Sequence, residues 1–427
     1  MGVAGHRPLT TAGPAGAGAA GRPSTARVLV LNAGSSTLKA SVVAADRPGD
    51  APQPPVAGLT INWGNDATKG ADVQAGVATV LAQLAEQGLE PGDLAAVAHR
   101  VVHGGEAFRE PALVDEALLA VIVALGPLAP LHNPVAAATI RAAQAALPGL
   151  AHVAVFDTAF HATLPEAAWR YPLPAEWEGW GLRRYGFHGL SVAWSVERAA
   201  TLLGRPARKL NLVVAHLGSG CSVTAVAGGR SLATSMGMTP LEGLMMGTRA
   251  GSIDPGIILA VLRDQRRTAA ELADDLNHLA GLLGVSGRSA GMRELEAAAT
   301  GGDQRAALAI EMFVDRTAAG IAAASTALTG LDALVFTGGI GENSGAVRAR
   351  IVERLAVLGL LPIDDTGPGG DRRLDQGSAG RAILRVAARE DVVAARAAWR
   401  IAGRIRPRAP GQPLVAWLGV SGPPRGG

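Results

Sequence analysis

The sequence predicts an α/β protein made of two similar domains that face each other across a cleft. Short apolar runs alternate with longer helical segments, which is typical of α/β layers. A strand, loop and strand that begin at Val28 return in similar form at Leu212, which indicates a duplicated unit. With 427 residues, the chain is long enough for two domains that each bury a core.

Local patterns support the elements of this fold. Three short apolar runs bounded by glycine or polar residues, at 27–32, 211–218 and 332–339, are typical of strands in a covered sheet. The run at 306–328 spaces its larger apolar residues three and four apart, which predicts a helix. The ends of the chain are rich in Gly and Pro. We expect a flexible leader over 1–26, with a disordered targeting arm as the alternative, and a flexible tail over 404–427.

Composition narrows the class of protein. Hydrophobic residues make up 48% and charged residues 18%, which favours an ordered, soluble protein. The longest apolar run, at 117–131, is broken by Gly126 and two prolines, so we expect no membrane span. A net charge of +3 gives no sign of a nucleic-acid partner. The single cysteine, Cys221, excludes an intramolecular disulfide and a cysteine-based zinc site, and fits the reducing cytoplasm.

Glycine-rich loops follow the strands. The loops at 33–36 and 218–220 each hold a Gly-Ser pair, and glycine lets backbone N–H groups approach an anion closely. Two such loops could hold a polyphosphate from both sides, and the alternative is a pair of simple hairpin turns. Their mutual resemblance and the nearby Lys39 favour phosphate, although neither loop has the Walker spacing.

A third glycine cluster, at 336–344, precedes a helical segment. Its glycines would make room for a flat base or sugar, unless the cluster is a plain strand-to-helix turn. Asn343 or Ser344 is expected to cap the helix that follows.

Seven motifs make the chain resemble the acetate kinases. They are "LNAGSSTLK", "HRVVHGGE", "PLAPLHNP", "VAVFDTAFH", "RRYGFHG", "TSMGMTPLEGLMMGTRAGSIDP" and "FTGGIGENS". The resemblance spans residues 27–400 and implies two duplicated ribonuclease-H-like domains, as in actin-like ATPases, that flank a nucleotide cleft. The N-terminal domain would cover 27–160 and be completed by a C-terminal helix at 394–403. The C-terminal, nucleotide-binding domain would cover 161–393.

The resemblance also implies an activity. It is the reversible, Mg²⁺-dependent transfer of a phosphoryl group from ATP to acetate, giving ADP and acetyl phosphate by direct in-line transfer, with Mn²⁺ as an alternative ion. The small-molecule partners would be acetate and ATP, and the protein would be a homodimer.

Three catalytic residues are implied: Asp157, His188 and Arg249. Donors and cations stabilise the charge of a transferring phosphoryl group, which suits His188 and Arg249. Acetic acid, with a pKa of roughly 4, is already ionised at pH 7, so no base is needed. We therefore expect Asp157 to hold magnesium and its waters or to orient the nucleophile, the alternative being a helix N-cap.

The resemblance places the substrate near Arg100 and His132. Arg100 would bind the substrate carboxylate through two parallel hydrogen bonds, unless it is an ordinary surface charge. His132 is otherwise a structural histidine. A pocket for the acetyl methyl group would be lined by Val102, Leu131, Phe187 and Pro240, with core packing as the alternative for each. Because one methylene is worth only about 1 to 3 kcal/mol, propionate should be a poorer substrate rather than an excluded one.

Metal and nucleotide positions complete the prediction. Asn32 and Glu390 would reach Mg²⁺ through water. The nucleotide would be bound by Lys39, His216, Leu217, Gly218, Ser219, Gly220, Gly291, Met292, Arg293, Gly339, Ile340, Gly341, Glu342 and Asn343.

Four positions depart from the family pattern. Ser219 replaces an asparagine that can donate to phosphate, and Gly291 replaces an aspartate suited to ribose or base. Arg389 and Asp391 flank Glu390 where the family usually has Asn and Glu, and Arg389 could pair with Glu390. Two rival functions remain at this stage. A propionate or butyrate kinase would need a wider pocket than Phe187 leaves, and a catalytically silent nucleotide-binding protein would lack the charged centre.

Overall fold

The structure is a computed structural model that describes residues 26–34, 37–45, 53–63, 70–130, 132–363, 365, 369–375 and 381–403. The expected tail, all of the expected leader except residue 26, residues 35 and 36 of the first predicted phosphate loop, and the predicted pocket residue Leu131 lie outside the described residues. No helix in the described ranges is both long and apolar enough to cross a membrane.

The first sheet has the strand order β3-β2-β1-β4-β6-β5 within the described residues. Its strands are β1 (Ala26–Ala33), β2 (Thr37–Ala45), β3 (Ala57–Asn62), β4 (Leu94–Val101), β5 (Ala112–Leu113) and β6 (Ala151–Phe156). Strands β1 to β3 form an antiparallel meander, and β5 is antiparallel to β6. Strands β1, β4 and β6 run parallel, so their carboxyl ends meet at one edge of the sheet.

The second sheet repeats this topology. Its order is β11-β12-β10-β7-β8-β9. Read from the other end, β9-β8-β7-β10-β12-β11 corresponds strand by strand to β3-β2-β1-β4-β6-β5 of the first sheet. Its strands are β7 (Asn211–Leu217), β8 (Cys221–Ala227), β9 (Arg230–Thr234), β10 (Ala333–Thr337), β11 (Arg372–Arg373) and β12 (Ala382–Arg385). Parallel and antiparallel pairs also correspond, which confirms the duplication seen at Val28 and Leu212.

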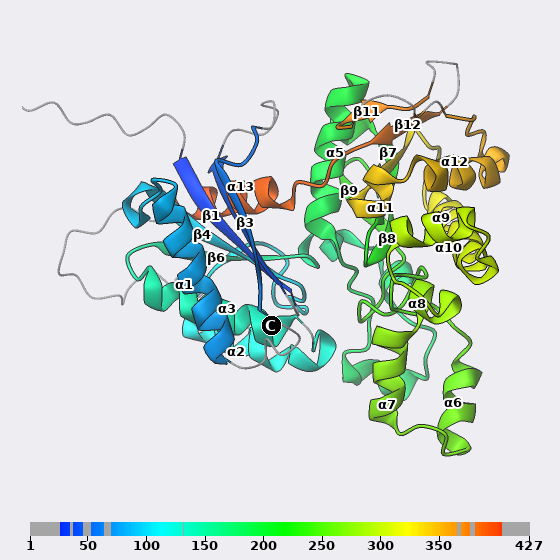
Figure 1. The fold of residues 1–427 in the computed structure, drawn as a ribbon, viewed down its shortest axis with the longest axis horizontal. Helices are drawn as coiled ribbons and strands as arrows, with labels where there is room; N and C mark the ends of the chain where they lie inside the picture. Colours follow the sequence, from blue (N-terminus) through cyan, green and yellow to red (C-terminus); the bar gives the residue numbers. More distant parts are fainter. Residues whose placement is uncertain are drawn as a thin grey trace, which may run out of the picture.

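The helices cover both sheets (Figure 1). They are α1 (Gly70–Glu86), α2 (Glu116–Ala124), α3 (Asn133–Ala146), α4 (Glu166–Trp169), α5 (Gly189–Leu203), α6 (Pro255–Arg263), α7 (Ala269–Asp274), α8 (Gly281–Ser286), α9 (Met292–Thr300), α10 (Gln304–Ser325), α11 (Gly338–Asn343), α12 (Gly345–Arg354) and α13 (Glu390–Ala402). We call the first sheet with α1, α2, α3 and α13 the N-terminal unit. The second sheet with α5 to α12 is the C-terminal unit.

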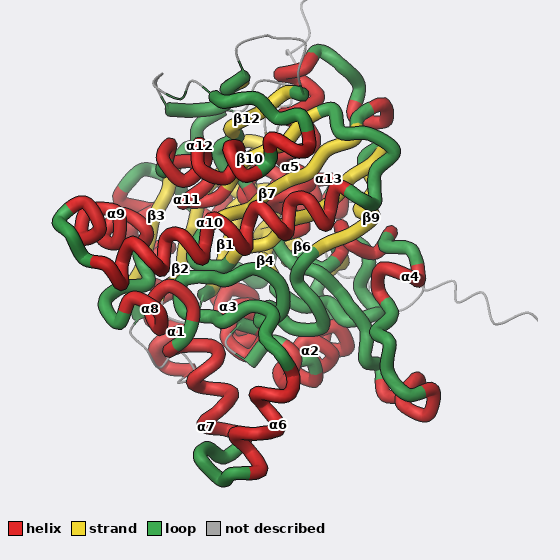
Figure 2. Tube along the Cα trace, turned by 90° about the vertical axis from the view of Figure 1, so that its right-hand side faces the viewer, coloured by secondary structure: helices red, strands yellow, loops and turns green. Residues whose placement is uncertain are grey.

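Helices α13 and α5 form the middle layer of the molecule. Helix α13 packs on β1, β2, β4 and β6, helix α5 packs on β7 and β10, and the two helices touch each other. Along β1, Val28 and Val30 face this middle layer while Leu29 and Leu31 face α1 and α3, as the two-residue period of a strand requires. Helix α10 covers the outer face of the second sheet, as Figure 2 shows.

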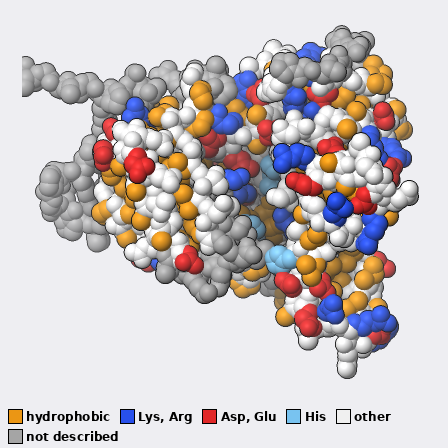
Figure 3. Space-filling model, in the orientation of Figure 1, with side chains coloured by type: hydrophobic (Ala, Val, Ile, Leu, Met, Phe, Trp, Pro, Cys, Tyr) orange, Lys and Arg blue, Asp and Glu red, His pale blue; other side chains and the backbone are white. Residues whose placement is uncertain are grey.

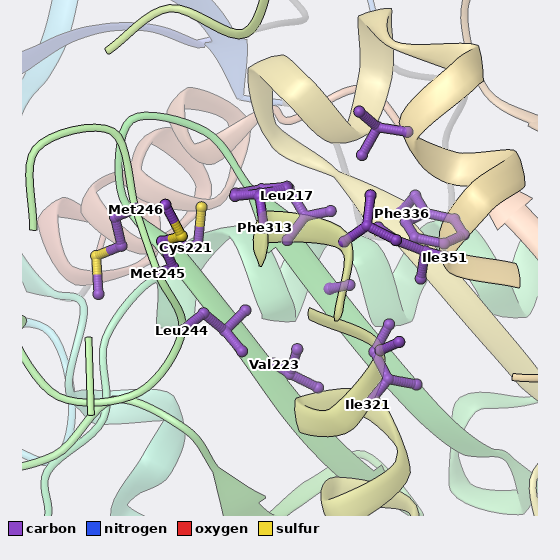
Figure 4. Close-up of a cluster of buried hydrophobic side chains, with 14 of the residues drawn as sticks. Leu217, Cys221, Val223, Leu244, Met245, Met246, Phe313, Ile321, Phe336 and Ile351 are labelled. Carbon is purple, nitrogen blue, oxygen red and sulfur yellow. The ribbon is translucent and has the colours of Figure 1, made fainter. Parts of the chain in front are cut away.

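The core of the C-terminal unit surrounds the cysteine. Cys221 is a buried free thiol that packs with Met245, Met246 and Phe313 (Figure 4). Its thiol donates to the Gly218 carbonyl at 3.3 Å, and burial raises the pKa of the thiol to about 12. Cys221 therefore serves as a small packing residue, as expected.

Candidate active site

A cavity of about 830 Å³ opens between the two units at the carboxyl ends of β1, β4, β7 and β10. Figure 3 shows histidine and basic side chains in the hollow between the units. The predicted site residues that line the cavity are Asn32, Lys39, Arg100, His132, His188, His216, Gly218, Ser219, Gly220, Arg249, Gly339, Glu342 and Glu390. Chain folding thus brings together polar groups from both copies of the duplicated unit.

Arg100 is the centre of a charged cluster at the end of β4. Its Nε and Nη2 donate to the two carboxylate oxygens of Asp157 at 3.1 and 2.5 Å, and its Nη1 donates to Oδ1 of Asn32 at 3.0 Å. The Glu390 carboxylate lies 3.5 Å from Nε. Arg100 is therefore neither an ordinary surface charge nor a free cation, and Asp157 is a salt-bridge partner rather than a helix cap.

Burial and charge oppose each other in this cluster. Burial disfavours the charged guanidinium, but the carboxylates of Asp157 and Glu390 outweigh it and raise the pKa of Arg100 above its ordinary value. Burial raises the pKa of Asp157, and Arg100 counters that effect. Asp157 is fully buried behind Arg100, so its carboxylate does not reach the cavity in this conformation.

Two histidines of the cavity wall, one before α5 and one in β7, stack on each other. The rings of His188 and His216 lie 4.1 Å apart between centroids with an interplanar angle of 20°. Nδ1 of His188 hydrogen-bonds the Ser222 hydroxyl at 2.9 Å, and Nδ1 of His216 bonds the Ser191 hydroxyl at 2.8 Å. Burial lowers the pKa of both rings, to about 4 for His216, and nearby Arg100 lowers them further.

His188 occupies an unusual backbone position. It has a φ of 58° in the left-handed region and directly precedes α5. The next residue, Gly189, donates its N–H to the carbonyl of Asp157 at 3.0 Å, and a Cβ there would lie 2.1 Å from that carbonyl oxygen. The strained turn and this close approach fix His188 beside the end of β6.

Arg249 faces the stacked histidines from a loop of the C-terminal unit. Its Nη1 donates to the Pro240 carbonyl at 2.6 Å. Within the described ranges, no carboxylate forms an ion pair with it, and burial lowers its pKa below the ordinary value. A cation that is largely buried without a carboxylate partner is suited to binding an anion.

The loop at 218–220 and the glycine cluster after β10 complete the cavity wall. The loop at 218–220 closes the β7–β8 hairpin, with the Gly218 N–H donating to the Gly220 carbonyl at 3.0 Å. It is therefore a hairpin turn that also lines the cavity. Gly338 has a φ of 78°, and a Cβ there would lie 2.8 Å from the Leu217 carbonyl, so the strand-to-helix turn after β10 packs closely on this hairpin. Ser344 caps α12 by accepting from the Val347 N–H.

The segment that leads into α13 corrects one expectation. Arg389 pairs with Asp391, from Nε to Oδ1 at 2.9 Å, instead of with Glu390. Glu390 is thereby left to face Arg100. The carboxylate of Glu342 accepts the Ala388 N–H at 2.9 Å and so ties the third glycine cluster to this segment.

Oxygen donors suited to a hard cation lie around Arg100. Among the described residues, no three His, Cys, Asp or Glu side chains form a metal-binding group. Asn32 and Glu390 nevertheless come from distant parts of the sequence, and both lie at the cavity wall against the Arg100 guanidinium. Mg²⁺ commonly uses one or two protein oxygens, with water and substrate phosphates supplying the rest, so these residues fit it.

Other predicted residues lie away from the cavity lining. Val102 and Phe187 belong to one buried apolar cluster, and Pro240 contributes its carbonyl to Arg249. Some of the residues predicted to bind the nucleotide also do not line the cavity, namely Leu217, Gly291, Met292, Arg293, Ile340, Gly341 and Asn343.

Sequence reasoning missed several residues that shape the site. Ser191 and Ser222 hold the stacked histidines, and their only sequence signal is proximity to His188 and Cys221. Glu242, in the loop that carries Arg249, accepts from Arg184 Nη2 at 2.5 Å and from the Tyr171 hydroxyl. Such partners are far apart in the chain, so no local pattern reveals them.

Comparisons with known proteins agree with this geometry. The model of the acetokinase family matches residues 27–396. An acetate kinase from Deinococcus radiodurans is 46% identical over 371 residues, covering 80% of this chain and 92% of the relative. A propionate kinase from Francisella tularensis has 36% identity and a TM-score of 0.78, and an acetate kinase from Porphyromonas gingivalis has 32% and 0.77. Each of these two alignments covers 88% of this chain and 99% of the solved structure. The expected two-domain α/β fold is therefore confirmed.

Proposed function

Because the chain belongs to the acetokinase family, we propose that it transfers a phosphoryl group reversibly between ATP and acetate, giving ADP and acetyl phosphate. The two substrates would meet in the cavity between the units, and the phosphoryl group would pass directly from one oxygen to the other.

One observation supports phosphoryl transfer most strongly. Arg249, which has no carboxylate partner among the described residues, faces His188 across Gly220. A Cβ on Gly220 would lie 2.8 Å from Nη2 of Arg249 and 3.2 Å from Nε2 of His188, so both groups aim at one small space. Two donors around one point are what the equatorial oxygens of a transferring phosphoryl group require.

Arg100 is proposed to bind the acetate carboxylate. A guanidinium has five N–H donors, and three serve Asp157 and Asn32, which leaves two for a substrate. His132 lines the same part of the cavity and stays neutral, since burial and then Arg100 and Arg249 lower its pKa to about 4. The salt bridge favours an orienting role for Asp157, which would hold Arg100 in place for the nucleophile.

Magnesium, with manganese as the alternative, is proposed to be held by Asn32 and Glu390 through water. When bound, the ion would neutralise charge on the ATP phosphates. The glycine loops at 33–36 and 218–220, together with Lys39, would hold those phosphates. The two domains are proposed to cover 27–160 with 394–403, and 161–393. When they close over the nucleotide and exclude water, the remaining nucleotide residues would contact the base and ribose.

The acyl specificity is proposed to favour acetate, with propionate as a second substrate. The Francisella tularensis propionate kinase has essentially the same fold, so the fold does not discriminate. Phe187 is fully packed, with its ring 5.5 Å from that of His103, and this packing supports a pocket that cannot widen easily.

A cytoplasmic homodimer is the proposed state of the protein. The buried, unpaired Cys221 fits a reducing compartment. Helices α6 and α7 project from the C-terminal unit, as Figure 2 shows, and Leu259 and Ile257 on α6 are 67% and 52% exposed. Apolar residues on a projecting element are suited to self-association. Light scattering of the Leu259→Asp variant would show a monomer if this surface forms the dimer, and an unchanged dimer would contradict it.

The activity is tested by trapping the acyl phosphate with hydroxylamine. Purified protein, ATP and Mg²⁺ are incubated with acetate, propionate or butyrate. Product should form most rapidly with acetate, more slowly with propionate and least with butyrate. Arg249→Ala should abolish it, whereas Arg208→Ala, which removes an exposed arginine, should not. Absence of product with every acid would overturn the kinase assignment.

A further inference from the structure

Serines hold the two stacked histidines of the cavity. The Ser222 hydroxyl lies 2.9 Å from Nδ1 of His188, and the Ser191 hydroxyl lies 2.8 Å from Nδ1 of His216. Both serines are fully buried. Within the described residues, each hydroxyl has no other hydrogen-bond partner. The direction of these two bonds decides where each imidazole carries its proton.

Hydrogen-bond accounting settles that direction. If Nδ1–H donated to the serine, the buried serine proton would have no acceptor, and an unsatisfied buried donor destabilises the folded protein. If the serine donates to Nδ1, the serine proton and Nδ1 are both satisfied, and the ring proton sits on Nε2 of a ring that lines the cavity. The second arrangement is therefore the stable one for both His188 and His216.

Two other histidines show the same arrangement with both nitrogens occupied. His161 has Nδ1 at 3.0 Å from the Ser231 hydroxyl, and its Nε2 lies 2.9 Å from the Phe187 carbonyl, which only an N–H can serve. His103 accepts the Gly105 N–H at Nδ1 and faces the Met238 carbonyl with Nε2. In His188 and His216, by contrast, Nε2 has no protein acceptor among the described residues.

The Nε2 atoms of the stacked pair face the glycine loops. A Cβ on Gly220 would lie 3.2 Å from Nε2 of His188, and a Cβ on Gly338 would lie 3.1 Å from Nε2 of His216. Both rings line the cavity. Burial keeps the rings neutral, and neutrality allows two imidazoles to stack without repulsion.

We propose that Ser191 and Ser222 are positioning residues that fix His216 and His188 as neutral Nε2–H donors, aimed side by side at the phosphate oxygens. This inference rests on the proposed phosphoryl transfer. Without the serine, a ring can take the other tautomer, which turns a lone pair toward the anion and repels it. The serines therefore act on the reaction through the histidines and touch no substrate.

The tautomer is tested directly, without any activity. Long-range ¹H–¹⁵N correlation spectra of ¹⁵N-histidine-labelled protein distinguish protonated from unprotonated ring nitrogens. We expect Nδ1 of His188 and His216 to be unprotonated in the wild-type protein. Ser222→Ala should give a mixture of tautomers for His188 only, and Ser191→Ala for His216 only. Wild-type rings protonated at Nδ1 would overturn the inference even if the protein is a kinase.

Kinetics test the role of the serines in the reaction. Ser222→Ala should lower kcat by about tenfold or more, as expected when one oriented donor to the transferring group is lost, with a smaller change in KM for ATP. Ser222→Thr, which keeps the hydroxyl, should recover most of the rate. Ser195→Ala is the matched control, because Ser195 is equally buried on α5, one turn beyond Ser191, and its hydroxyl has no partner within the described ranges.

The outcomes separate the two proposals. If no acid yields acyl phosphate but the spectra show Nε2–H rings, the kinase assignment fails and the tautomer assignment stands. If the wild type is active and Ser222→Ala and Ser191→Ala both keep kcat within twofold of the Ser195→Ala control, the positioning role is overturned.

Discussion

Gly220 lies where a side chain would intrude on the proposed phosphoryl site. A Cβ added there would lie 2.8 Å from Nη2 of Arg249 and 3.2 Å from Nε2 of His188. Ordinary contacts of a Cβ begin at 3.4 Å, so the guanidinium must retreat by about 0.6 Å. That retreat also strains its hydrogen bond to the Pro240 carbonyl. We therefore predict that Gly220→Ala displaces both donors from the reacting group.

The expected size of the effect follows from this displacement. Misplacing a catalytic group by about 1 Å can cost about a hundredfold in rate. A shift of this kind should therefore lower kcat by about tenfold to a hundredfold, which corresponds to about 1.4 to 2.7 kcal/mol of transition-state stabilisation. The thermal midpoint should change little, because Arg249 and His188 line the cavity and can shift into that space.

The assay is hydroxylamine-trapped acetyl phosphate at saturating ATP and acetate, with the thermal midpoint measured in parallel. Gly330→Ala is the matched control, since a Cβ there meets nothing within 4 Å. A folded Gly220→Ala protein with the kcat of the control would refute the placement of the phosphoryl group between Arg249 and His188.

Three further predictions concern the charge cluster, the acid stability and the phosphate loop. Asp157→Asn should lower kcat/KM for acetate by about 30-fold or more, near 2 kcal/mol, because Arg100 loses its orienting charge. A change confined to the Mg²⁺ requirement would contradict that role. The free energy of unfolding, measured with urea, should fall as the pH drops from 7 to 5. The buried His99 and His152 have lowered pKa values when folded, so the unfolded chain binds more protons below about pH 6.5. A flat profile would show that these rings do not resist protonation. Ser219→Asn should lower KM for ATP by about threefold to tenfold, because it adds one side-chain donor to the loop, and an unchanged KM would show that position 219 does not reach the nucleotide.

The strands and the duplication were predictable because their signals are local. Short apolar runs and flanking glycines mark β1 and β7 within a few residues, and both strands lie where those patterns place them. The helix expected over 306–328 is α10 (Gln304–Ser325), whose start is fixed by the Asp303 side chain accepting from Arg305 and Ala306.

Side-chain partners were less predictable because they depend on geometry between distant elements. Arg389 had two acidic neighbours in sequence, and only the fold shows that it binds Asp391 and leaves Glu390 to Arg100. Apolar residues raise the same difficulty, since a pattern marks Val102 and Phe187 as apolar but does not say whether they line a cavity or fill a core. The sequence positions of Ser191 and Ser222 likewise carry no sign of the rings that they hold.

Helix α13 has a consequence for how the protein is synthesised. It begins with Glu390 at the cavity and covers the inner face of the first sheet, whose strands β1 and β2 are the earliest described elements of the chain. While the ribosome is still translating the C-terminal unit, that face of the sheet has no covering helix, and apolar residues such as Val28 stay open to water or to chaperones. A nascent chain that stops short of α13 lacks both this cover and Glu390, so folding of the first unit and assembly of the charged cluster are completed together, once α13 has been translated.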